Sequence, residues 1–177
     1  MKWLEELITR VLSLIPRLQL INPDEGGIRI TLGNRVKDCK PGWYIYWPLI
    51  QVFYVISVTP QIPDVRPQSV MTSDGQSFTV SGAIKYRIRD VRKSVLSVQD
   101  YDVSIQTLVC GVITRYCSTH TVDELLDVGL LEADIKKELQ KEARGWGIEV
   151  MSCYITDMGN AINLRLLTGS IQNEVSY

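Results

Sequence analysis

The sequence lacks most of the patterns on which catalysis, metal binding and nucleic-acid binding depend. It has a single histidine, His120, and no nucleophile-elbow, phosphate-binding or dinucleotide-binding glycine motif. Its 19 lysines and arginines are balanced by 20 aspartates and glutamates, which gives a net charge of −1. Because no excess positive charge is available to attract a phosphate backbone, we expect no nucleic-acid partner.

Cysteine is also scarce and unpatterned. The four cysteines show no Cys-x-x-Cys or Cys/His spacing: Cys39, Cys110, Cys117 and Cys153. Cys110 and Cys117 are seven residues apart on a predicted helix and off its apolar stripe, so we predict no metal site. A domain of this size does not need disulfides, so we expect reduced thiols that face a cytosol. We expect no cofactor.

The chain does contain enough apolar material for one folded domain. It has 177 residues, of which 45% are hydrophobic and 22% charged. The central signal is a strand beginning near Phe78, in which apolar residues occupy every second position as far as Ile88. A turn at Ser73–Gly75 precedes this strand, and Asp90 after it can cap a helix. We therefore predict a turn, a long half-buried strand and a helix start.

Residues 2–15 are predicted to form an amphipathic helix that Pro16 ends. Its apolar stripe consists of Trp3, Leu4, Leu7, Ile8, Val11, Leu12 and Ile15. A helix of this length spans about 21 Å, short of the roughly 30 Å hydrocarbon core, so it can lie in a bilayer interface but not cross it alone. Its charges argue against a secretory signal. Taken alone, the stripe is more simply a helix that packs on the domain core.

Several strands are predicted before the central one. Residues 22–27 are rich in turn formers, and residues 28–32 alternate in polarity before the hairpin turn at Gly33-Asn34. The almost unbroken apolar run of residues 49–58 predicts a strand buried on both faces. Prolines at 60, 63 and 67 then enforce an extended segment.

The aromatic segment between these strands cannot be buried on one face. An extended chain places Trp43, Ile45 and Trp47 on one side and Tyr44 and Tyr46 on the other. Exposed tryptophan and tyrosine suit a bilayer interface, so one interpretation is a membrane contact here, extended by Leu49. The alternative is that a sheet covers one face and the helix of residues 101–116 covers the other. Cys39 lies nearby and is open to acylation, although an ordinary half-buried thiol is the simpler interpretation.

The second half of the chain is mainly helical. Asp90–Val98 predicts a short helix, and a longer one opens at Asp100-Tyr101. Thr121 and Glu124 have the spacing of a capping box, in which both side chains satisfy backbone donors. A last helix from Leu131 ends between Gly145 and Gly147. A final strand follows.

These motifs together resemble the membrane-proximal domain of the stomatin, prohibitin and flotillin family, known as SPFH or band 7. The family has Pro-x-Glu-Gly-Val where this chain has residues 23–28, and Pro-Gly-Leu-His-Phe-Leu-x-Pro-Phe where it has residues 41–49. It has Tyr-Arg-Val-x-Asp at residues 86–90, Thr-Leu-Asp-Glu-Leu at residues 121–125 and Trp-Gly-Ile/Val-x-Val at residues 146–150.

The resemblance implies an α+β fold, mainly antiparallel sheet packed with several helices, preceded by the amphipathic helix. It implies a membrane-associating segment over residues 1–21, an SPFH domain over residues 22–158 and a short tail over residues 159–177. Family members continue into a coiled coil, whereas the tail shows no sustained heptads. We therefore expect weak self-association or assembly with longer relatives, and not large rings.

The function implied is a non-enzymatic scaffold on the cytosolic face of a membrane, monotopic or peripheral, which organises lipids or membrane proteins, with a membrane protease among its candidate clients. The residues predicted to bind the membrane are the seven of the amphipathic stripe and Trp43, Tyr44, Ile45, Tyr46, Trp47 and Leu49. The first alternative is a soluble protein-interaction module. The second is a hydrolase using His120, although a lone histidine in a helix-entry loop is more simply a surface or capping residue.

Overall fold

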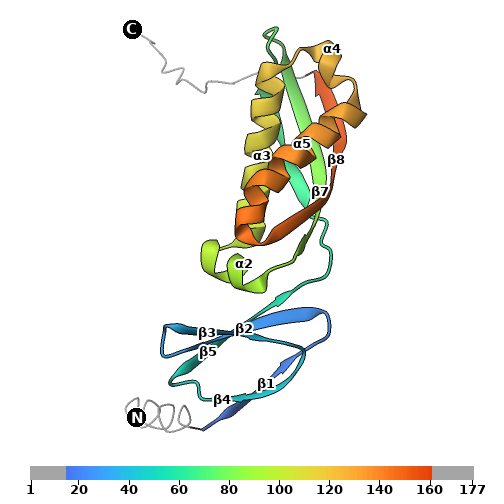
Figure 1. The fold of residues 1–177 in the computed structure, drawn as a ribbon. Helices are drawn as coiled ribbons and strands as arrows, with labels where there is room; N and C mark the ends of the chain where they lie inside the picture. Colours follow the sequence, from blue (N-terminus) through green and yellow to red (C-terminus); the bar gives the residue numbers. More distant parts are fainter. Residues whose placement is uncertain (1–14, 161–177) are drawn as a thin grey trace, which may run out of the picture.

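The computed structural model describes residues 15–160, which form two lobes connected by one crossing of the chain (Figure 1). Residues 15–57 form a lobe of strands, here called the β lobe, and residues 64–160 form a larger α/β lobe. The helix predicted over residues 2–15 lies outside the described residues except for Ile15, as does the chain beyond residue 160. The fold is α+β and its sheets are antiparallel, as expected, and the strands of residues 15–160 are divided among three sheets.

The β lobe is built from two sheets. Strands β1 (Arg17–Ile21) and β4 (Gly42–Tyr46) form one pair, and β3 (Arg35–Cys39), β2 (Glu25–Thr31) and β5 (Gln51–Ser57) form the other sheet in that order. The two sheets approach closely because Gly27 has no side chain: a Cβ there would lie 2.7 Å from Cδ1 of Ile21. Phe53 of β5 meets the rings of Tyr44 and Tyr46, with centroids 5.9 and 5.0 Å away.

The α/β lobe wraps helices over one face of the sheet β6-β7-β8. Its strands are β6 (Asp64–Met71), β7 (Ser77–Ile88) and β8 (Ile148–Asn160). Its helices are α2 (Val91–Ser97), α3 (Tyr101–Thr119), α4 (Val122–Leu125) and α5 (Val128–Ala143), followed by the short 3-10 helix η1 (Arg144–Trp146). Ile84 of β7, Ile105 of α3 and Ile135 of α5 are completely buried between these layers.

The turns and caps predicted for this lobe are confirmed. Gly75 adopts φ +79° in the turn before β7, which is a conformation that favours glycine. The carboxylate of Asp90 accepts a hydrogen bond of 3.0 Å from the backbone N–H of Lys93. The carboxylate of Glu124 accepts one of 2.9 Å from the backbone N–H of Thr121, as in a capping box. Helix α3 begins after Asp100, as predicted, and α5 begins three residues earlier than expected.

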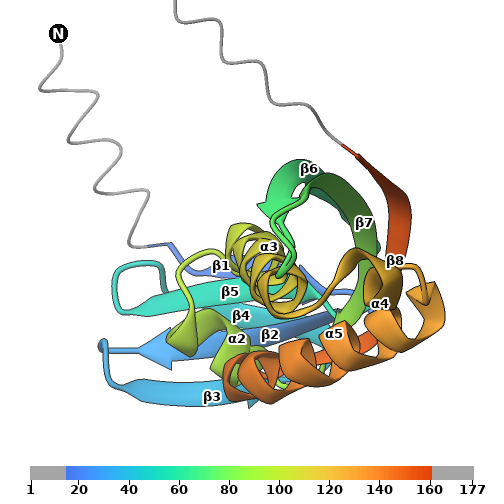
Figure 2. The ribbon, with the colours of Figure 1, turned by 90° about the horizontal axis from the view of Figure 1, so that it is seen from above.

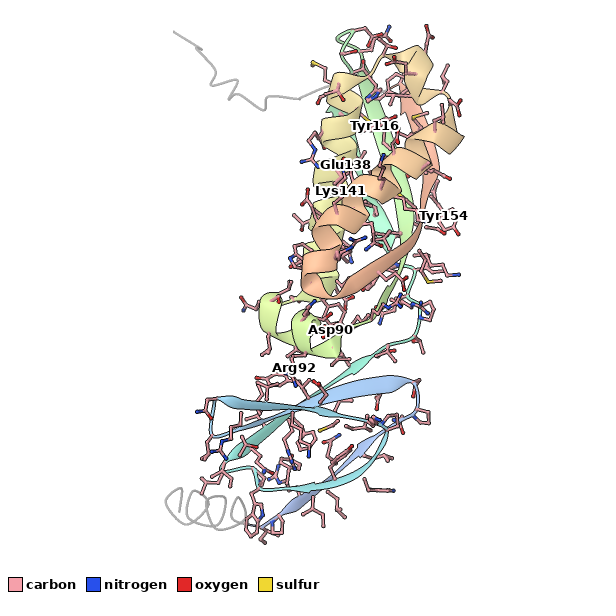
Figure 3. All side chains as sticks on the ribbon, in the orientation of Figure 1. Asp90, Arg92, Tyr116, Glu138, Lys141 and Tyr154 are labelled. Carbon is pink, nitrogen blue, oxygen red and sulfur yellow. The ribbon has the colours of Figure 1, made fainter. Side chains whose placement is uncertain are left out.

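The lobes meet at a small junction. Arg92 of α2, labelled in Figure 3, forms a bidentate ion pair with Asp38 of β3 at 2.9 and 3.0 Å. Gly26 lets α2 approach β2, because a Cβ there would lie 2.5 Å from Cγ2 of Val91. The backbones of Gln61 and Tyr86 exchange two hydrogen bonds where the chain crosses. The Tyr86 hydroxyl donates to Asp102, and burial raises the pKa of Tyr86.

Four details of the sequence analysis need correction. Strand β5 is not buried on both faces: Val52 and Tyr54 are exposed, because only the face that carries Phe53 meets the β1–β4 pair. Residues 17–21, placed with the N-terminal segment, form β1 of the folded lobe, because Pro16 ends a helical pattern but not an alternating one. Cys117 lies in the core and not off the apolar stripe. Strand β8 extends to Asn160, past the boundary drawn at residue 158.

Candidate functional site

The outer face of the β1–β4 pair is a plate of exposed apolar side chains. Register places Leu18 opposite Ile45 and Leu20 opposite Trp43, so all four project from the same side of the sheet. Their exposed fractions run from 40% for Leu20 to 70% for Trp43. We call these four residues the apolar plate. A soluble surface scatters such residues singly, so a contiguous group indicates a contact with another apolar surface.

Two neighbouring turns extend the apolar surface beyond the end of β4. The turn at Trp47–Ile50 exposes Trp47, Leu49 and Ile50, and the turn after β2 exposes Leu32. The backbone N–H of Leu32 donates to the carbonyl of Ile50 at 2.8 Å, which holds the two turns together. Leu32 has φ +51°, a conformation that a residue with a bulky side chain rarely adopts.

The structure separates the predicted membrane-binding residues into three groups. Trp43 and Ile45 lie on the plate. Trp47, Leu49 and Ile15 are also exposed, and they are close in sequence to the strands that form the plate. Tyr44 and Tyr46 point inward and are half-buried against Phe53. The sheet that contains β5 covers this inner face, as the alternative expected, whereas the face assigned there to the helix of residues 101–116 leaves Trp43 and Ile45 exposed. The other predicted residues lie outside the described range.

Sequence reasoning missed four residues of this surface: Leu18, Leu20, Leu32 and Ile50. The signal for two of them was present, because Leu18 and Leu20 alternate with polar residues directly after Pro16. Their exposure depends on pairing with β4, which is a contact between segments more than twenty residues apart. Cys39 is buried and burial raises its pKa, which favours the simpler interpretation of an ordinary thiol.

His120 is the C-terminal cap of α3. Its backbone N–H donates to the carbonyl of Cys117 at 3.3 Å, and its ring stacks on Tyr116 with a centroid separation of 3.9 Å. Its Nδ1 lies 2.8 Å from the carbonyl oxygen of Tyr116. Burial raises the pKa of Cys117, and raises the pKa of Cys153 to about 11, so both thiols stay protonated at neutral pH. Within residues 15–160 no three His, Cys, Asp or Glu side chains are grouped to hold a metal.

The fold and the motifs define an SPFH-type domain, and comparison with known proteins agrees. The model of the SPFH domain / Band 7 family matches residues 19–161, so the chain belongs to this family. An uncharacterised protein of Methanocaldococcus jannaschii is 26% identical over 157 residues, which cover 88% of this chain and 79% of that protein.

Proteins named stomatin are also similar to this chain. Stomatin-1 of Caenorhabditis elegans is 25% identical over 85% of this chain and 46% of its own length. A stomatin homolog of Pyrococcus horikoshii is 22% identical over 86% of this chain and 58% of its own length. The chain therefore spans about half the length of these stomatins.

Among the helices of residues 15–160, none combines the length and the hydropathy that crossing a bilayer requires.

Proposed function

We propose that this protein is a non-enzymatic scaffold that lies on a membrane through its β lobe and organises lipids or membrane proteins there. SPFH proteins are in general membrane-associated scaffolds, which supports the broad assignment. The observation that carries the specific one is the apolar plate, because its four side chains are in register on one face and the described residues leave them uncovered.

The orientation follows from the shape of the molecule. In Figure 1 the β1–β4 pair lies at the end of the molecule away from the α/β lobe. Seen along the perpendicular direction in Figure 2, the strands of the β lobe spread out broadside, while α3 is seen nearly end-on. The plate therefore faces along the axis of α3, which supports a scaffold that stands on the bilayer and presents its helices away from it.

The energy available suits reversible binding. Burying four half-exposed apolar side chains at about 1 kcal/mol each contributes about 4 kcal/mol. The amphipathic stripe of residues 2–15 stays a prediction, and its contribution would add to that of the plate. Replacing Leu7 and Ile8 by glutamate tests the stripe separately, since neither residue belongs to the plate.

Tryptophan fluorescence tests the contact directly. The chain has 4 tryptophans, so the full chain with Trp3→Phe and Trp146→Phe retains only Trp43 and Trp47 as reporters. We expect a blue shift and protection from an aqueous quencher when vesicles are added. The control variant keeps only Trp146, which is half-buried in η1, and its spectrum should not change. An unchanged spectrum from Trp43 and Trp47 would refute the membrane contact.

A soluble protein-interaction module remains the alternative. A groove of about 510 Å³ between α3 and the end of α5 favours it, with Leu108, Val112 and Trp146 in its lining. Under this alternative the protein would not bind vesicles, and co-purification would recover soluble partners. Under the scaffold proposal, co-purification from native membranes should recover membrane proteins, and a membrane protease is one candidate.

A further inference from the structure

Three cations gather on one face of the sheet β3-β2-β5. Strand pairing places Arg29 of β2 directly opposite Lys37 of β3. Arg35 lies two residues before Lys37 in the same strand, so its side chain leaves the sheet on the same side. This is the face that carries Phe53 and is turned toward the β1–β4 pair. We call these three residues the cation cluster.

The cation cluster has no counter-charge among the described residues. Like charges directly opposite each other in a sheet repel. Asp38 points to the other face, where Arg92 holds its carboxylate at 2.9 and 3.0 Å. Glu25 accepts hydrogen bonds from the backbone and the side chain of Asn22 at 2.9 and 3.1 Å. The repulsion is therefore not relieved by either nearby carboxylate.

Arg29 shows a second anomaly. Its Nε is buried without a hydrogen-bond partner, and within residues 15–160 it is the one buried side-chain nitrogen or oxygen in this condition. Leaving a buried donor unpaired is costly, so an external acceptor is the expected solution. The guanidinium group presents a planar fork of donors that matches the oxygens of a phosphate.

A simpler explanation covers only part of the cation cluster. Charged side chains on edge strands prevent sheets from pairing with other chains, and β3 is an edge strand. This accounts for Arg35 and Lys37, which are exposed. It does not account for Arg29, because β2 is the central strand of its sheet and needs no such protection. One bound anion accounts for all three residues.

The position of the cation cluster indicates where such an anion comes from. Arg29 is paired with Phe53, which packs on Tyr44 and Tyr46 of the strand that carries half of the apolar plate. In Figure 2, β3 lies at the outer edge of the β lobe, with β2 between it and β4. Arg35 and Lys37 leave β3 on the face that is turned toward the β1–β4 pair, which is the side that would face a bilayer, where phosphate groups are abundant.

We propose that Arg29, Arg35 and Lys37 bind the phosphate group of an anionic phospholipid headgroup while the apolar plate rests on the bilayer. This inference depends on the membrane contact proposed above and adds the class of lipid that the protein prefers. The plate supplies apolar attraction that is independent of lipid charge. The cation cluster supplies selectivity for anionic lipid, which weakens as salt rises.

The test measures binding of the full chain to two kinds of vesicle, phosphatidylcholine alone and phosphatidylcholine with about 30% phosphatidylserine. We expect tighter binding to the anionic vesicles. The variant Arg35→Gln with Lys37→Gln should lose about fivefold of that preference for each cation removed, with unchanged binding to neutral vesicles. Arg29 is left in place because it is half-buried, so folding is not at risk.

The control is Lys136→Gln with Lys137→Gln on α5, which removes the same charge from exposed positions of the α/β lobe. It should keep the preference. Equal losses in both variants, or no preference in the parent, would overturn the site. Displacement from anionic vesicles by inorganic phosphate at constant ionic strength would assign the site to free phosphate and overturn the lipid. Failure of the parent to bind neutral vesicles would count against the apolar plate, and a preserved preference for anionic vesicles would still support the cation cluster.

Discussion

In the α/β lobe, Ile84, Ile105 and Ile135 come from three different elements and are completely buried, whereas Leu18, Trp43 and Ile45 in the β lobe stand out from a two-stranded sheet. The contrast extends to the lobes as wholes. Among residues 15–57, the buried apolar side chains are Ile21, Ile28 and Cys39, and the rest of the buried core belongs to the α/β lobe. The α/β lobe therefore contains most of the buried core, whereas the β lobe exposes several of its large apolar side chains on one surface.

The difference follows from how each sheet is covered. The sheet β6-β7-β8 has α3 and α5 packed over one face, which buries the apolar half of an alternating strand. The β1–β4 pair is covered on its inner face by the sheet β3-β2-β5 and on its outer face by nothing among the described residues. A two-stranded pair is marginal alone, so the β lobe depends on its second sheet and on the junction with α2.

The largest expected effect is a loss of folding stability when the core of the α/β lobe is truncated, in contrast to a small change when the apolar plate is truncated. Ile135→Ala removes a completely buried side chain and should lower the free energy of unfolding by about 2–5 kcal/mol. Ile45→Ala removes a side chain that is 64% exposed and should change it by about 0.5 kcal/mol or less. Urea titration of both variants measures the two changes in the free energy of unfolding. Similar losses in the two would mean that the plate is part of the folding core.

An intermediate effect is expected at the junction between the lobes. Gly26→Ala places a Cβ 2.5 Å from Cγ2 of Val91, so α2 must move and stability should fall by about 1–3 kcal/mol. Gly111→Ala is the matched control, because nothing lies within 4 Å of a Cβ there and α3 should gain up to about 1 kcal/mol. Thermal unfolding distinguishes them by the sign of the change. A stabilised Gly26→Ala variant would show that the lobes are not packed through this contact.

The smallest effect concerns acid stability in the α/β lobe. The hydrogen bond from Arg87 to Glu149, at 2.6 Å, holds the pKa of that carboxyl below its ordinary value of 4.5. Because the folded-state pKa is lowered, the stabilisation is fully present above pH 4.5 and is lost as the pH falls through the folded value. Glu149→Gln should therefore reduce the dependence of stability on pH below that point and leave binding to vesicles unchanged. An identical acid profile in the variant would show that the pair contributes nothing.

The sequence predicted the α/β lobe better than the β lobe, and the reason is local. The caps at Asp90 and Thr121 and the turn at Gly75 involve residues only three or four positions apart. Turns, caps and helix faces could therefore be derived from short stretches of sequence. The strand with which a given strand pairs cannot be derived from the residues next to it in the sequence. The inward position of Tyr44 depends on Phe53, and the exposure of Leu20 depends on its pairing with Trp43.

The same limit explains what was missed at the candidate site. The periodicity of residues 43–47 correctly divided the aromatic segment into two faces. It did not indicate which of the two faces would be covered. The cation cluster had no sequence signal, because Arg29, Arg35 and Lys37 become neighbours only when β2 and β3 pair. An overall charge of −1 concealed a local excess of positive charge.

Vesicle flotation of two charge-matched variants tests most directly whether the β lobe is the membrane-contact lobe. Leu18→Glu with Ile45→Glu alters the apolar plate, and Leu126→Glu with Leu130→Glu makes the same change at two side chains, both 63% exposed, in the α/β lobe. The plate variant should lose about thirtyfold in vesicle affinity, because two apolar contacts of about 1 kcal/mol each are removed. The α/β-lobe variant should float like the parent. A plate variant that floats as well as the parent, or an α/β-lobe variant that loses as much as the plate variant, would contradict the division of roles between the two lobes.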